Sequence, residues 1–139
     1  MRRQKARETA FLLFFRMDMG RLTLEEAKEF VEKKPDPDIW EYALWLAKGT
    51  QENLSEIDGI ISSHSPDWEL DRMFSTDRNI LRLAVFELLH GKDVPPAVIT
   101  DQALKLANKF GTPTSAKFIN GILGAILRER SGENLQGEN

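Results

Sequence analysis

The amino-acid sequence predicts an all-α protein: about seven helices in two small bundles that pack into one compact domain. Apolar residues recur three and four positions apart in nearly every segment, and no segment shows the strict alternation of a half-buried strand. Glycine- and proline-containing breaks separate these segments. A chain of 139 residues is long enough for one such domain.

The N-terminal half predicts three helices. The apolar pattern of the first helix runs over about residues 4–17, and Gly20 is expected to end that helix. The stretch "TLEE" (23–26) has the pattern of a capping box and opens a short second helix. Asp36 and Pro37 open a third, whose apolar pattern continues to Ile61 although two glycines interrupt it.

The stretch "SSHSP" (62–66) separates this half from a second group of helices. "DWELDRMF" predicts a short helix or turn, and Ser75 or Thr76 is expected to cap a strong helix that ends at Gly91. "VPPA" opens the next helix, which ends at Gly111, and a last helix follows over 115–130. We therefore expect an N-terminal subdomain with a basic arm (1–64), a C-terminal subdomain (65–130) and a mobile polar tail (131–139).

The composition is that of a globular protein, with 41% hydrophobic and 29% charged residues. The chain has no cysteine, which excludes disulfides and thiolate metal sites and fits a reducing compartment. Its longest apolar run, "AFLLFF" (10–15), is far shorter than a membrane span, and no small-residue cleavage site follows it. The expected location is the cytoplasm, with neither a signal peptide nor contact with a membrane.

The positive charge is concentrated at the N-terminus. Five cations and one carboxylate give residues 1–16 a charge of +4, although the chain as a whole carries −3, so the other 123 residues carry −7. A basic arm on an acidic body is typical of a protein that meets a polyanion with one patch. The alternative is a solvated terminus whose charges cluster by chance.

Catalytic and metal-binding patterns are missing from the sequence. The two histidines, His64 and His90, are 26 positions apart, and no zinc, calcium or phosphate-loop motif occurs. The glycine pair Gly121 and Gly124 fits close helix packing better than a ligand site. The sequence therefore predicts neither an enzyme nor a bound metal or cofactor.

Nucleic-acid binding has better support. Arg2, Arg3, Lys5 and Arg7 fall within about one and a half helical turns, so several of them could reach one phosphate backbone. At the start of the last helix, Lys117, Phe118 and Asn120 combine a phosphate partner, a ring for stacking and an amide that can read a base edge. The alternative is that Phe118 is a core residue, Lys117 is solvated and Asn120 caps a neighbouring helix.

Six motifs in order resemble the transcription antitermination factor NusB family. They begin with "RRQKARETAFLLFF", "ENLSEIDGII" and "DWELDRM", and continue with "DRNILRLAVFELLHGKDVPPAVI", "KLANKFG" and "SAKFINGIL". Together they span about residues 2–128. The resemblance implies a non-catalytic all-α protein that binds a boxA element of single-stranded RNA together with NusE, a small-subunit ribosomal protein. The pair would help RNA polymerase to resist termination during ribosomal RNA synthesis.

The resemblance also implies roles for individual residues. The RNA-binding residues would be Arg2, Arg3, Arg7, Lys117, Phe118 and Asn120. Asp77 would contact the protein partner; Glu87 would either do the same or satisfy a buried polar network. Four residues depart from the family pattern and could change individual contacts, namely Asp101, Gln102, Asn108 and Gly124.

Two other readings stay open. One is a helical protein-interaction module that does not bind RNA. The other is the RNA-binding appendage of a ribosomal RNA methyltransferase, although no Rossmann-like segment occurs in this sequence. A homodimer formed through the N-terminal half is a further possibility, and it would cover the basic arm.

Overall fold

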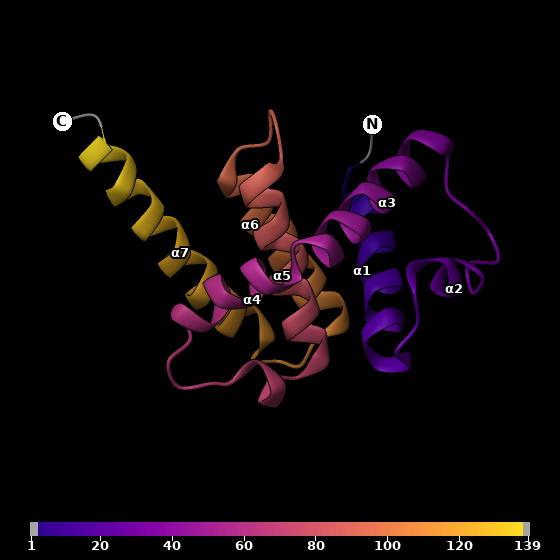
Figure 1. The fold of residues 1–139 in the computed structure, drawn as a ribbon, viewed down its shortest axis with the longest axis horizontal. Coiled ribbons are helices and arrows are strands. Elements are labelled where there is room, and N and C mark those ends of the chain that lie inside the picture. Colours follow the sequence, from indigo (N-terminus) through magenta and orange to yellow (C-terminus); the bar gives the residue numbers. More distant parts are fainter. Residues whose placement is uncertain (1–2, 138–139) are drawn as a thin grey trace.

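The structure, a computed structural model, describes the backbone of residues 3–137 and the side chains of residues 3–132. Within that range the chain forms seven α-helices and one 3₁₀ helix, without a strand, as the sequence predicts (Figure 1). In chain order they are α1 (Arg3–Gly20), α2 (Leu24–Lys28), α3 (Pro37–Glu52), α4 (Leu54–Ser63), the 3₁₀ helix η1 (Leu70–Arg72), α5 (Ser75–His90), α6 (Pro96–Phe110) and α7 (Ser115–Gly137).

Helix α1 forms because its apolar residues recur at helical spacing, and it buries one side along its length. The buried residues are Ala6, Arg7, Ala10, Phe11, Leu13, Phe14 and Met17. They pack against α3 and α5, and the stacked rings of Phe11 and Phe110 join α1 to the end of α6. The helix ends at Gly20, as the sequence predicts.

The capping box at the start of α2 is confirmed. The Glu26 backbone N–H donates to the Thr23 hydroxyl at 3.1 Å, and the Thr23 N–H donates to the Glu26 carboxylate at 2.9 Å. These two bonds satisfy amide groups that the first turn of a helix otherwise leaves unpaired.

Helices α3 and α4 are separated at Asn53, and neither Gly49 nor Gly59 breaks the rod. Asn53 has φ −114° and ψ 21°, and its side-chain amide donates to the Gly49 carbonyl at 2.7 Å. Gly49 has a packing role instead: a Cβ atom there would lie 2.0 Å from Cζ of Phe86. The absence of that atom lets the Phe86 ring lie against α3.

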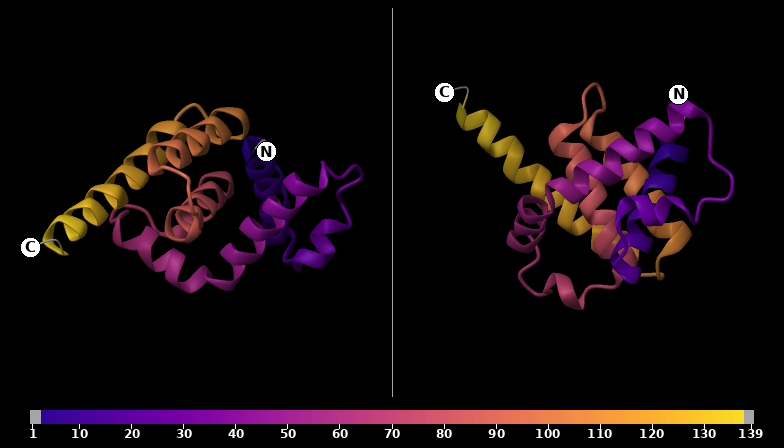
Figure 2. Two further views of the ribbon diagram at one scale, coloured as in Figure 1. Left: turned by 90° about the horizontal axis from the view of Figure 1, so that it is seen from above. Right: turned by 45° about the vertical axis from the view of Figure 1, so that its right-hand side comes forward.

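The C-terminal helices differ from expectation at two ends. Helix α5 begins at Ser75 without a side-chain cap, so neither Ser75 nor Thr76 caps it. The last helix continues to Gly137 instead of ending near residue 130, and Figure 2 shows it extending beyond the rest of the molecule. Most of the segment 131–139 is therefore helical, and its expected mobility stays a prediction. Gly91 and Gly111 follow the ends of α5 and α6 as predicted.

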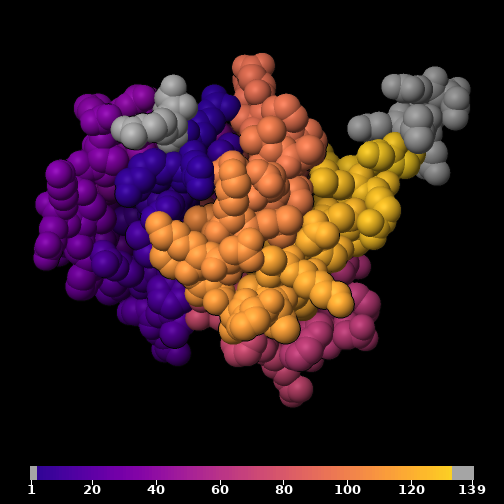
Figure 3. Space-filling model, turned by 180° about the vertical axis from the view of Figure 1, so that it is seen from behind, coloured from indigo at the N-terminus to yellow at the C-terminus, as the bar shows by residue number. Residues whose placement is uncertain are grey.

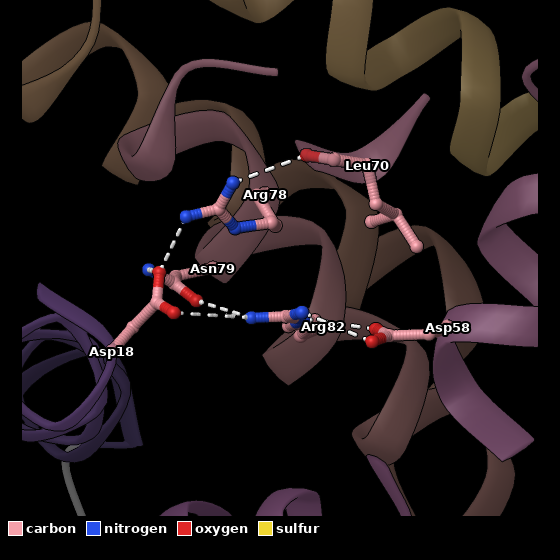
Figure 4. A network of polar contacts seen from close by, with 6 residues as sticks. All are labelled: Asp18, Asp58, Leu70, Arg78, Asn79 and Arg82. Carbon is pink, nitrogen blue, oxygen red and sulfur yellow. Dashed lines mark hydrogen bonds and ion pairs between the residues drawn. The ribbon is translucent and has the colours of Figure 1, made fainter. Parts of the chain in front are cut away.

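One hydrophobic core joins the two halves of the chain, with buried side chains from α1, α3 and α4 alongside those of α5, α6 and α7. A polar network on α5 adds to this connection (Figure 4). Arg78 and Asn79 donate to Asp18 of α1, and Arg82 binds both carboxylate oxygens of Asp58 of α4 at 2.9 Å. Burial would raise the pKa of Asp18, but its bonds to Arg78 and Asn79 outweigh burial and lower it. The expected subdomain boundary at residue 64 stays a prediction.

Over the part of the chain that the structure covers, no helix combines the length and the apolar character that crossing a membrane requires.

Candidate RNA and partner interface

The first turns of α1 and the middle of α6 line an open groove of about 460 Å³. All of its lining side chains are polar or charged: Arg3, Gln4, Lys5, Arg7, Glu8 and Gln102. Lys5 is exposed and forms no ion pair with any described residue. The Arg3 guanidinium lies 5.0 Å from the centre of the Tyr42 ring, a cation–π contact that holds the side chain at the edge of the groove. Arg2 lies outside the described residues.

Arg7 does not belong to the exposed surface. Only 7% of it is exposed, and its guanidinium donates to both carboxylate oxygens of Glu87, at 2.7 and 2.6 Å. Burial would lower the pKa of Arg7, but the bonds and the charge of Glu87 outweigh it and raise that pKa. With its donors turned inward, Arg7 is poorly placed to reach a phosphate. The pair with Glu87 gives Arg7 a structural role, and its expected role in RNA binding stays a prediction.

Glu87 is equally inaccessible, with 2% of its surface exposed. It also accepts a 2.7 Å hydrogen bond from the Tyr42 hydroxyl, and burial together with this bond raises the pKa of Tyr42 to about 12. Of the two roles that the sequence left open for Glu87, the geometry favours the buried polar network over direct contact with a partner.

A second groove, of about 590 Å³, lies where the start of α7 meets η1 and the start of α5. Lys117 and Phe118 line it, together with Trp68 and Phe74, both of which are more than half exposed. Phe118 is partly buried and packs edge-on against Trp68, with ring centres 6.2 Å apart. Phe118 is therefore one wall of a groove, neither fully in the core nor a free platform.

Asn120 is exposed but is not part of this lining. It lies two residues beyond Phe118, which is about 200° around a helix. The structure thus brings Lys117 and Phe118 together and directs Asn120 away from them.

Asp77, the expected partner-binding residue, lies in the wall of this second groove. It is 4% exposed, and its Oδ1 atom is buried without a hydrogen-bond partner among the described residues. A buried carboxylate oxygen costs free energy until a donor reaches it. This groove therefore offers a bound molecule an acceptor, a cation and several apolar walls.

Sequence reasoning missed Trp68, Phe74 and Gln102 as surface residues of the two grooves. The available signal was a tryptophan and a phenylalanine in a polar, proline-containing loop, where no core pattern accounts for them. At the rim of the second groove, the His64 ring contacts the Glu129 carboxylate and joins α4 to α7. Nowhere in the described range do His, Asp or Glu side chains cluster as metal ligands do.

The comparisons with known proteins cover nearly the whole chain. The model of the NusB family matches residues 4–128. The "Transcription antitermination protein NusB" of Desulforamulus reducens is 44% identical over 91% of this chain and 90% of its own, and that of Syntrophomonas wolfei is 39% identical over 95% and 100%. These relatives are named for a role in transcription, which agrees with the conclusion that the chain is not an enzyme.

Several solved structures share the fold. NusB of T. maritima superimposes with a TM-score of 0.86 at 39% identity, over 93% of this chain and 92% of that one. A structure described as antitermination factors NusB and NusE in complex with double-stranded RNA matches with a TM-score of 0.78 at 32% identity, over 91% and 96%. The motifs, the helical fold and these similarities agree, and the chain belongs to the NusB family.

Proposed function

We propose that this protein is a transcription antitermination factor that binds boxA-type single-stranded RNA together with the ribosomal protein NusE and supports ribosomal RNA transcription. The observation that carries the proposal is the groove at the start of α1, where the cations of Arg3 and Lys5 remain accessible on a body of net negative charge. The related complex of NusB and NusE with double-stranded RNA supports RNA and NusE as the two classes of partner. The activity belongs in the cytoplasm, within the transcription complex of RNA polymerase.

The proposed RNA surface consists of Arg2, Arg3 and Lys5 at the start of α1, with Lys117, Phe118 and Asn120 at the start of α7. Arg3, Lys5 and Lys117 would neutralise phosphates, and Phe118 would stack on a base from its place beside Trp68. Asn120 would use its exposed amide on a base edge. Arg7 supports this surface from below through its pair with Glu87.

We place the protein partner on the side of the second groove formed by the loop before η1 and the start of α5, which leaves the α7 side with Lys117 and Phe118 to RNA. On the partner's side, the buried Oδ1 atom of Asp77 has no donor among the described residues. A cationic or amide side chain of NusE could supply that donor, while Trp68 and Phe74 provide exposed apolar area. Aromatic residues around a buried polar contact are typical of the energetically dominant part of an interface.

Fluorescence anisotropy tests this function. A labelled single-stranded boxA RNA is titrated with the protein, alone and in the presence of NusE, at several salt concentrations. We expect salt-dependent binding that NusE strengthens, because a second basic surface adds contacts to the same strand. A flat salt response with retained NusE binding would identify the protein as an interaction module without RNA affinity.

A homodimer is a second arrangement that one observation favours. Leu12 and Met19 lie seven residues apart on the outer side of α1, and both are exposed, as is Phe30 beyond α2. Light scattering on the purified protein, with Met19→Glu as the variant, distinguishes a dimer from a monomer.

A further inference from the structure

The first proposed RNA-binding region lies beside the middle of α6, and the second follows the C-terminal end of that helix. Arg3 and Lys5 share their groove with Gln102, in the first half of α6, whereas Lys117 follows the turn after its last residue. From Gln102 to the last residue, Phe110, helix α6 rises about 12 Å. Viewed from behind, α1, α6 and the start of α7 lie next to one another on one face of the molecule (Figure 3). A strand that contacts both regions across this face has to pass along α6.

One side of α6 carries the groups that such a strand needs. Gln102, Lys105 and Lys109 are three and four residues apart, so they form a row along the helix. Both ends of this row are directed toward α1: Gln102 lines the groove with Arg3, and the Lys109 ammonium lies 2.7 Å from the Glu8 carboxylate. The row therefore continues the first groove toward α7.

The charges of the row are available to a ligand. The side chains of Lys105 and Lys109 are 51% and 57% exposed. Lys105 forms a loose 3.5 Å pair with Asp101, and Lys109 is paired with Glu8. An ammonium group has three donors, so each lysine can hold its carboxylate and still bind a phosphate oxygen.

We propose that Gln102, Lys105 and Lys109 form a phosphate-binding row that carries single-stranded RNA along α6, from the start of α1 to the start of α7. The inference rests on the proposed function and extends it to a helix that the sequence did not assign to RNA. RNA is the occupant that fits, because the row is cationic, extended and continuous with the RNA-binding residues at its two ends. Lys105 and Lys109 contact phosphates, and the amide of Gln102 contacts the sugar or a base edge.

The test compares two doubly substituted proteins of equal charge. Lys105→Ala with Lys109→Ala removes the cations of the row, whereas Lys33→Ala with Lys48→Ala removes two exposed lysines elsewhere. Lys48 is a matched residue because it too forms a loose pair four residues along its helix, with Glu52 at 4.0 Å. Binding of labelled boxA RNA is measured by anisotropy over a range of salt concentrations, and circular dichroism verifies the fold of each variant.

We expect the row variant to flatten the slope of log K against log salt by about 1.4, from about 0.7 per phosphate contact on a single strand. A fourfold rise in salt should then weaken the wild type about sevenfold more than the row variant. The Lys33 and Lys48 variant should keep the wild-type slope. Glu8→Gln should strengthen binding, because it removes the carboxylate of α1 that pairs with Lys109 and frees the Lys109 ammonium for a phosphate.

Other outcomes overturn the inference. Equal slopes for the two double variants would indicate a general charge effect, and an unchanged slope in the row variant would exclude phosphate contact. A row variant that binds RNA normally but loses NusE would make the row a protein surface. If loss of the ion pair between Lys109 and Glu8 disturbs α1, the single variant Lys105→Ala still tests phosphate binding by the row. If the wild type shows no salt-dependent RNA binding, the proposed function fails. If the wild type binds RNA and the row variant keeps the same salt slope, only this inference fails.

Discussion

Arg7 of α1 and Glu87 of α5, 80 positions apart in the chain, are joined by two hydrogen bonds of 2.7 and 2.6 Å inside the protein. Burying this pair removes two charges from water, which costs free energy. The second hydrogen bond of the guanidinium and the bond from the Tyr42 hydroxyl offset part of that cost. The pair ties the basic first helix to the centre of the C-terminal half.

We predict that Arg7→Ala and Glu87→Ala each lower the free energy of unfolding by about 3–5 kcal/mol, because each leaves the other charge buried without a partner. Arg7→Met combined with Glu87→Leu should recover most of that loss. Lys48→Ala, which removes an exposed pair, should cost less than about 1 kcal/mol. Urea unfolding measures all four. An Arg7→Ala protein of normal stability whose RNA binding depends less on salt would restore Arg7 to the RNA surface.

The titration of Tyr42 reports on the same network, and it is a clean signal because the chain has one tyrosine. Burial and the bond to Glu87 raise its pKa from 10.0 to about 12. The native protein therefore holds this proton more tightly than the unfolded chain. The stability that results is complete below pH 10 and is lost as the pH rises through about 12. Tyrosinate absorbance should show this late midpoint, and Glu87→Gln should move it toward 10; a wild-type midpoint near 10 contradicts the network.

Gly49 and Gly59 provide a matched pair of substitutions in neighbouring helices. At Gly49 a Cβ would lie 2.0 Å from Phe86, so Gly49→Ala should lower stability by about 1–3 kcal/mol through overpacking. At Gly59 nothing lies within 4 Å, so Gly59→Ala should raise stability by about 0.5–1 kcal/mol through helix propensity alone. Thermal unfolding measures both. A gain of stability in the Gly49→Ala variant would show that the Phe86 ring does not occupy the space above Gly49.

Phe118→Ala should separate RNA stacking from core packing. Since Phe118 is partly buried, its removal should cost roughly 1–2 kcal/mol of stability, below the 3–5 kcal/mol of a core phenylalanine. RNA affinity should fall by about 1–3 kcal/mol, as for the loss of one stacked base. Phe30→Ala, on an exposed phenylalanine of the N-terminal half, is the control and should leave RNA affinity unchanged. Normal RNA affinity in the Phe118 variant would remove the stacking role.

Local chemistry made much of the fold predictable. The Thr23 and Glu26 capping box, the prolines that open α3 and α6, and the glycines that follow α5 and α6 act over a few residues, and all appear where the sequence places them. The break at Asn53 could not be predicted, because it lies inside a continuous apolar pattern. Helix propensity instead marked Gly49 and Gly59 as the expected interruptions.

The helices, the family motifs and the concentration of positive charge in the first sixteen residues all follow from the order of the amino acids. Which of these charges face solvent depends on how the helices pack against one another. Helical spacing puts Arg3 and Arg7 on one side of α1, but the packing of α5 against that helix covers Arg7 and leaves Arg3 at the edge of a groove. Likewise, helical spacing separates Asn120 from Phe118, but only the packing of the loop before η1 brings Trp68 beside Phe118 and makes that ring one wall of a groove. The reason is physical: helix formation depends on neighbours within about four residues, whereas burial depends on partners that are distant in the chain.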